Sequence, residues 1–71
     1  MTYAEAFDVI DAGEGRWSVR LRQPRCLVGE VWRTGAGFLL WDSNQRQAGT
    51  FPSMTDALRT LWSLERQQAV L

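Results

Sequence analysis

Arginine side chains gather in the segment RWSVRLR, which spans residues 16–22. With the alternation of a β-strand, its three apolar residues share one face, which we expect to be core. The opposite face then carries Arg16, Ser18, Arg20 and Arg22. Guanidinium groups bind phosphates and carboxylates through planar, paired hydrogen bonds. This row is therefore suited to contact nucleic acid or the acidic groups of a protein, or simply to face water.

The other reactive residue types do not form a recognisable catalytic site. The chain has no histidine and one cysteine, Cys26, which excludes the common zinc sites and Cys–His or Ser–His nucleophiles. The carboxylates are scattered, and no pair shares an apolar setting suited to general acid–base catalysis. The segment TGAG, residues 34–37, joins two predicted strands and does not precede a helix, as a phosphate-binding loop would. We predict a protein that is not an enzyme and that uses no cofactor and no metal.

Length and charge limit the remaining functions. A chain of 71 residues forms one small domain, whose core contributes little net stability. Aromatic packing is the expected additional source of stability, and homodimerisation is a second one that the sequence leaves open. The net charge is zero, so no global field draws the chain to DNA or to an anionic membrane. Charge is nevertheless uneven along the sequence. The four charged residues of segment 1–15 are all acidic, whereas five of the six in segment 16–33 are arginines.

Alternating apolar residues and turn residues predict an α+β fold, an antiparallel β-meander packed on one C-terminal helix. The strands are expected at about 7–11, 16–22, 27–33, 37–42 and 46–51, and the helix at about 54–68. Pro52 ends the last strand, Ser53 is a suitable N-cap, and Asp56 complements the helix dipole. The whole chain, residues 1–71, is read as one domain.

The N-terminal segment allows two interpretations. TYAE has the pattern of a helix capping box, whereas FDVID alternates like a strand. We favour a strand from about Phe7, and a short helix over residues 2–6 before it is compatible with the sequence. A three- or five-residue loop within AGEGR would place the apolar residues of the first two strands on one face, whereas a four-residue loop would place them on opposite faces. With the five-residue loop, Asp8 would lie opposite Arg20 on the other face.

One helix can cover only one face of the sheet, so the other face is the expected contact surface. We expect Leu27, Gly29 and Val31 to face the helix. The polarity of Asp42 suggests that Leu39 and Trp41 also face it. The opposite face would then carry Arg16, Arg20, Arg22, Val28, Glu30, Trp32, Phe38, Leu40, Arg46 and Thr50.

The leading hypothesis is a small protein-binding module that acts through this face as an adaptor, regulator or inhibitor of a larger machine. Such single-domain chains are typical of compact bacterial or phage genomes. Tryptophan and arginine are enriched at binding hot spots. The predicted partner-binding residues are Arg20, Arg22, Val28, Trp32, Phe38 and Leu40. The plainer alternative is that Asp8 and Glu30 neutralise the arginines through cross-strand pairs, leaving an ordinary solvated surface.

The second half of the chain shares features with a DNA-binding family. Its last strand ends in Gly49-Thr50-Phe51, a short polar cap follows, and Ala57 is placed to pack the helix on the sheet. Residues 29–62 thereby resemble the three-stranded-sheet-plus-helix DNA-binding domain of plant ethylene-response factors and of the N-terminal arms of some phage and transposon integrases. The resemblance implies, as the alternative function, binding of double-stranded DNA by the open sheet face, as a dimer.

In that family, arginines and tryptophans of the open face read the major groove. Trp32, Arg33 and Arg46 are the residues that the resemblance carries over, as phosphate or base contacts. The middle strand departs from the family pattern because it offers Phe38, Leu40 and Asp42. The full set of candidate nucleic-acid contacts is Arg16, Arg20, Arg22, Arg33 and Arg46.

The sequence also predicts a location. MTYAEAFDVIDA lacks the basic and apolar regions of a signal peptide, and no apolar run approaches the ~18–20 residues of a membrane span. A lone thiol is normal in a reducing compartment. We therefore expect a cytoplasmic protein that does not contact a membrane.

Overall fold

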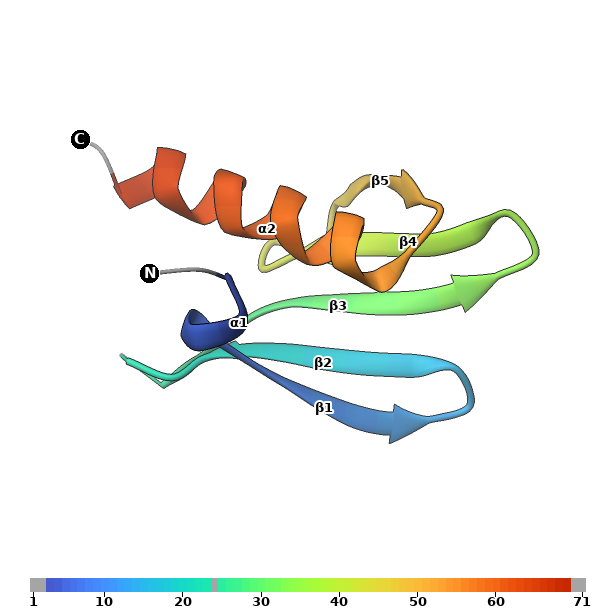
Figure 1. The fold of residues 1–71 in the computed structure, drawn as a ribbon, viewed down its shortest axis with the longest axis horizontal. Coiled ribbons are helices and arrows are strands. Elements are labelled where there is room, and N and C mark those ends of the chain that lie inside the picture. Colours follow the sequence, from blue (N-terminus) through green and yellow to red (C-terminus); the bar gives the residue numbers. More distant parts are fainter. Residues whose placement is uncertain (1–2, 24, 70–71) are drawn as a thin grey trace.

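The computed structural model describes residues 3–23 and 25–69, and within these bounds it contains one antiparallel sheet and two helices (Figure 1). The five strands lie side by side in chain order. They are β1 (Phe7–Gly13), β2 (Arg16–Leu21), β3 (Cys26–Thr34), β4 (Gly37–Asp42) and β5 (Gln47–Phe51). The helices are α1 (Tyr3–Ala6) and α2 (Met54–Ala69). The predicted α+β meander with a C-terminal helix is confirmed.

The ambiguous N-terminal segment contains both of the elements that its sequence suggested. The short helix α1 leads directly into β1, which begins at Phe7. Asp8 lies opposite Arg20, as the five-residue loop requires. A bulge between Asp11 and Gly13 then shifts the register at the end of the hairpin. The turn places Glu14 at a φ of 56°, between two glycines that are also at positive φ.

The beginning of α2 is fixed by a reciprocal cap. The backbone N–H of Asp56 donates a hydrogen bond to Ser53 Oγ at 3.2 Å. The Ser53 hydroxyl in turn donates to Asp56 Oδ2 at 3.0 Å. The first contact satisfies a backbone N–H that the first turn of a helix leaves free, the second joins the two side chains, and the Asp56 carboxylate also opposes the positive end of the helix dipole. The cap predicted from the sequence is therefore present.

The core lies between the sheet and α2, which packs on β3, β4 and β5. Val19, Val31 and Leu40 are the fully buried residues of the sheet, and α2 contributes Ala57, Leu58 and Leu61. Ala6 and Phe7 extend this core at the N-terminal end, and the Phe7 ring meets Trp62 edge-on at 5.7 Å between centroids. Because α1 contacts α2 as well as β1, the two described helices lie on the same side of the sheet.

Gly29 allows the helix to approach the middle of the sheet closely. A Cβ at this position would lie 2.6 Å from the carbonyl oxygen of Trp41 and 3.1 Å from Leu61 Cδ2. The first of these neighbours is backbone and cannot move aside, so only glycine fits between β4 and the helix without distortion. The expectation that Gly29 and Val31 face the helix is confirmed.

The predicted faces of β4 are wrong. Leu40 is fully buried under α2, and it is Leu39 and Trp41 that face away from the helix. The polarity of Asp42 misled the sequence interpretation, because this residue serves the turn after β4 and its side chain is not placed by burial. Phe38 shares the face of Leu40 and packs against the core.

The first half of β3 is also reversed from expectation. Val19 pairs with Gly29, whereas the next residue, Arg20, pairs with Leu27, so Val28 is an extra residue in β3. Such a bulge interrupts the alternation of side chains. Val28 is consequently buried in the core, and Leu27 is 53% exposed on the other side.

Candidate functional site

The face of the sheet opposite α2 is not covered by any helix in the described part of the chain. We call it the open face. The strand register assembles it in three rows, because residues that pair across strands point to the same side. The rows are Asp8–Arg20–Leu27, Ile10–Ser18–Glu30–Trp41 and Arg16–Trp32–Leu39–Thr50.

A tryptophan pair forms the centre of the open face. The rings of Trp32 and Trp41 lie 5.2 Å apart between centroids at an interplanar angle of 46°. Leu39, directly opposite Trp32 in the register, is half-buried beside them. Toward the β1 and β2 side, Ile10 is 43% exposed and Leu27 is 53% exposed. The open face therefore presents aromatic and aliphatic groups from three strands, β1, β3 and β4.

The indole N–H groups of the tryptophan pair lack acceptors. Trp32 Nε1 and Trp41 Nε1 are both buried, and neither makes a hydrogen bond with the described residues. Buried polar groups are nearly always paired in folded proteins. A donor left without a partner costs about 1–3 kcal/mol. The pair thus holds two buried donors that no described residue satisfies.

The arginines of the open face are already engaged to different degrees. The Arg16 guanidinium stacks over the Trp32 ring, 4.3 Å from its centroid. Arg22 Nε donates to Asp8 Oδ1 at 2.8 Å, so Asp8 pairs with Arg22 although it lies opposite Arg20 in the register. Arg20 is exposed and makes no ion pair within residues 3–23 and 25–69.

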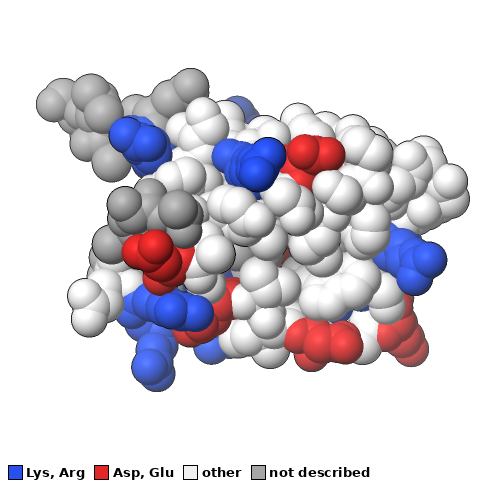
Figure 2. Space-filling model, viewed as in Figure 1, with Lys and Arg blue, Asp and Glu red and all other residues white. Residues whose placement is uncertain are grey.

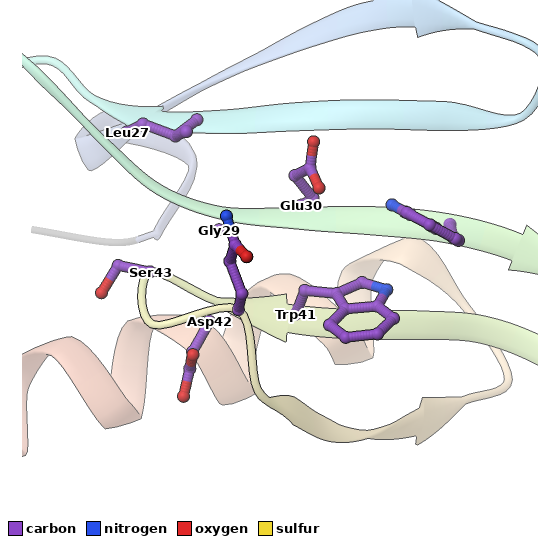
Figure 3. A pocket seen from close by; sticks show the side chains of 8 residues that line it. Leu27, Gly29, Glu30, Trp41, Asp42 and Ser43 are labelled. Atoms are coloured by element: carbon purple, nitrogen blue, oxygen red, sulfur yellow. The ribbon is translucent and has the colours of Figure 1, made fainter.

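A pocket of about 400 Å³ opens beside Trp41 (Figure 3). Glu30 and the Trp41 indole project into view from the neighbouring strands β3 and β4, with α2 behind the sheet. Glu30 is half-buried, and its carboxylate has no hydrogen bond or ion pair among the residues that the structure describes. The residues that line the pocket are Leu27, Gly29, Glu30, Trp32, Trp41, Asp42, Ser43 and Gln45.

Asp42 organises the turn that closes one end of the pocket. Its Oδ1 accepts the backbone N–H groups of Asn44 at 2.8 Å and Arg46 at 3.0 Å. These contacts hold Gln45, which also lines the pocket, at a φ of 61°, an uncommon conformation for a residue with a side chain. In Figure 3 the Asp42 carboxylate points toward α2, so Glu30 is the carboxylate that faces the pocket from the open side.

Asp42 also acts on the helix. Partial burial raises the pKa of the Glu65 carboxyl above its ordinary value, and the negative charge of Asp42 raises it further. Both causes disfavour the ionised form of Glu65. This coupling lies on the helix side of the sheet and does not involve the open face.

The structure brings together only some of the predicted site residues. Arg16, Arg20 and Trp32 lie on the open face, and Arg22 lies beside Asp8 at its margin. Arg33 and Arg46 are exposed but lie elsewhere, at the end of β3 and in the turn before β5. The prediction that the remaining partner-binding residues lie on this face is wrong, because the core includes Val28 and Leu40 and has Phe38 packed against it.

The residues that sequence reasoning missed are Ile10, Leu27, Leu39 and Trp41. One signal could have identified two of them. The loop between β3 and β4 holds two residues, Gly35 and Ala36, and such a loop pairs Thr34 with Gly37. Counting back along the strands then places Leu40 opposite Val31. An inward Val31 therefore requires an inward Leu40 and an outward Leu39 and Trp41.

Chemistry and comparisons add no further site. In the described part of the chain, no group of three or more His, Cys, Asp or Glu side chains is placed to hold a metal ion. Neither described helix has the length and apolar character needed to cross a membrane. Comparison of the chain with protein-family models, curated proteins and solved structures gave no match. The resemblance of residues 29–62 to DNA-binding domains therefore stays a prediction.

Proposed function

We propose that this chain is a non-enzymatic protein-binding module that contacts its partner with the open face. The observation that carries the proposal is the Trp32–Trp41 pair, which occupies the centre of a sheet face without a covering element in the described residues. Exposed apolar surface on a small domain marks a site of interaction more often than chance. An adaptor, a regulator or an inhibitor of a larger machine would each use such a face.

The composition of the open face matches that of a protein interface. Binding hot spots are enriched in tryptophan and arginine and lie near the centre of the contact, surrounded by groups that exclude water. Trp32, Trp41 and Leu39 would form the apolar centre. Arg20 and Glu30 would supply the charged contacts around it.

Charge distribution favours a protein partner over DNA. Affinity for DNA comes largely from cations that neutralise phosphates. On the open face, Arg22 is paired with Asp8 and the Glu30 carboxylate lies close to the centre. Figure 2 shows the opposite face, on which α2 lies, and there too basic and acidic side chains are interspersed without one continuous basic surface. The alternative reading of the arginines as a DNA-binding row receives no support from this arrangement.

We expect the module to act in the cytoplasm. Cys26 is exposed and has no disulfide partner in the described chain. Such a thiol stays reduced in the cytosol, whereas in an oxidising compartment it would form mixed disulfides.

The proposal is tested by affinity capture from a lysate of the native host, with the bound proteins identified by mass spectrometry. Trp32→Ala and Arg20→Glu alter the open face, and Arg59→Glu is the matched control because Arg59 is an exposed arginine on α2. We expect a partner that the wild type and the control retain and that both open-face variants lose. A partner retained by all four proteins would contradict the proposal.

Two further measurements test the alternative ligands of the open face, a second copy of the chain and DNA. Size-exclusion chromatography that shows a dimer, dissolved by Trp32→Ala, would assign the face to a second copy and make the protein a homodimer. Retention on random DNA that falls steeply with salt and is lost in Arg20→Glu would assign it to nucleic acid. Either result would replace the adaptor proposal.

A further inference from the structure

We propose that the pocket beside Trp41 binds the guanidinium group of an arginine side chain from the partner protein. This inference rests on the proposed function and names the chemistry of the contact. The site consists of the Trp41 ring, the Glu30 carboxylate and the Leu27 side chain, on the open face of β3 and β4.

The strand register places an aromatic ring and a carboxylate on the same side of the pocket. Glu30 and Trp41 are directly opposed across β3 and β4. The Cβ atoms of such a pair are separated by about 4.5–5.5 Å. A group that stacks on the Trp41 ring is therefore within reach of the Glu30 carboxylate. In Figure 3, both side chains border the same space, and Leu27 borders it from farther along β3.

The pocket offers a negative charge that the chain itself does not neutralise. Glu30 is half-buried as a residue, and its carboxylate has no ion pair or hydrogen bond with the described residues. The arginines of the open face do not neutralise Glu30. Arg16 stacks on Trp32, and Arg20 lies exposed in the next row of the sheet. A carboxylate that borders an apolar pocket without a cation favours a positively charged occupant, which can form charge-assisted hydrogen bonds with it.

The chain shows on the same face how a guanidinium packs on an indole. The Arg16 guanidinium lies 4.3 Å from the centroid of the Trp32 ring. Trp41 is the second indole of this pair and lies beside the unpaired carboxylate, whereas Trp32 lies beside the arginine. The pocket thus offers a second indole, Trp41, on which a guanidinium can stack in the way that Arg16 stacks on Trp32. It also offers the Glu30 carboxylate, whereas Arg16 has no carboxylate partner among the described residues.

The geometry favours arginine over lysine. A guanidinium is planar, stacks on aromatic rings and donates two parallel hydrogen bonds to a carboxylate, whereas an ammonium is a strongly hydrated point charge. The pocket, of about 400 Å³, exceeds the size of a guanidinium alone. The remaining space allows the aliphatic stem of the arginine to lie along Leu27.

The test is a titration of the whole chain, labelled with ¹⁵N, with N-acetyl-arginine amide. The chain has four tryptophans, whose indole N–H signals are resolved in a ¹H–¹⁵N correlation spectrum and assigned with single Trp→Phe variants. We expect saturable shifts of the Trp41 and Trp32 signals, with a Kd on the order of 1–50 mM for this minimal probe. The neutral isostere N-acetyl-citrulline amide should leave the signals in place, and N-acetyl-lysine amide should bind several-fold more weakly.

Glu30→Gln is the decisive variant because it removes the charge and keeps the shape. It should weaken binding of the arginine probe about tenfold, the loss expected for a charge-assisted pair of hydrogen bonds. Glu14→Gln is the matched control, since Glu14 is an exposed carboxylate in the β1–β2 turn away from the pocket. It should leave the titration unchanged.

Several results would overturn the inference. They are the absence of shifts, shifts centred on Trp17 or Trp62, equal affinity for the lysine probe, and a titration that Glu30→Gln does not weaken. The partner capture described above separates this failure from that of the proposed function. A partner lost from Trp32→Ala but fully retained by Glu30→Gln would overturn the arginine pocket and leave the protein-binding face in place.

Discussion

Val31 and Leu40 oppose each other across β3 and β4, and both are fully buried beneath α2. This pair decides which side chains remain outside. With Leu40 inside, Leu39 and Trp41 must point to the open face, where Trp41 meets Trp32 and borders the pocket. The binding surface proposed for this chain is therefore a direct consequence of the register between two strands.

The register predicts losses of stability of very different size for two adjacent leucines. Leu40→Ala should lower the free energy of unfolding by about 2–5 kcal/mol, because it leaves a cavity in the core. Leu39→Ala, on the half-buried open face, should lower it by about 1 kcal/mol or less. Urea unfolding followed by tryptophan fluorescence measures both. Equal losses, or a larger loss for Leu39→Ala, would show that β4 has the other register.

The close approach of the sheet to α2 predicts a strong effect of a single methyl group. Gly29→Ala would place Cβ 2.6 Å from the Trp41 carbonyl oxygen, so β4 or the helix must shift. We expect a loss of about 1–3 kcal/mol. In a domain of this size, that lowers Tm by about 4–8 °C for each kcal/mol.

Gly35→Ala is the control for this change. Gly35 lies in the β3–β4 loop, is not at positive φ, and has open space where a Cβ would be. Its free energy of unfolding should change by no more than about 0.5 kcal/mol, as expected for a surface substitution, and its Tm should change correspondingly little. A Gly29→Ala protein as stable as this control would contradict the packing described for the middle of the sheet.

The pKa of Glu65 predicts how stability depends on pH. Because this pKa is raised in the folded state, the folded protein binds the proton more tightly than the unfolded chain. Stability from this group therefore falls as pH rises from the ordinary glutamate value, near 4.5, through the raised value. Glu65→Gln should raise Tm at pH 7, by no more than the few degrees that a surface change allows.

The same substitution should have little effect below pH 4, where Glu65 is protonated in both states. Thermal unfolding followed by circular dichroism at the two pH values makes the comparison. A gain that is equal at both pH values would mean that charge is not its cause.

Most of the fold could be predicted from the sequence because local signals agree with it. Ser43-Asn44 marks the turn between β4 and β5, and glycine or proline marks the other connections. Alternation marks β1 and β2, and Ser53 with Asp56 marks the start of α2. For the first hairpin, apolar alternation restricted the loop to three or five residues, and the structure has the pairing of the five-residue loop.

The composition of the open face was harder to predict for two physical reasons. The segment FLLW in β4 is apolar on both faces, so it carries no alternation, and the polar Asp42 that follows serves the turn. The bulge at Val28 depends on tertiary packing and leaves no period in the sequence. Trp32 was placed correctly because Gly29 and Val31, on the other side of β3, pack toward the helix.

The central claim is that the open face binds the partner, and two adjacent residues of β1 test it most directly. Ile10 lies on the open face and is 43% exposed, whereas Val9 lies on the helix side and is 40% exposed. Ile10→Thr and Val9→Thr each keep the β-branched shape that suits a strand and make one exposed aliphatic group polar. The affinity of each for the captured partner is measured by calorimetry. The account predicts that Ile10→Thr weakens binding several-fold and that Val9→Thr does not. Weaker binding by Val9→Thr alone would contradict it.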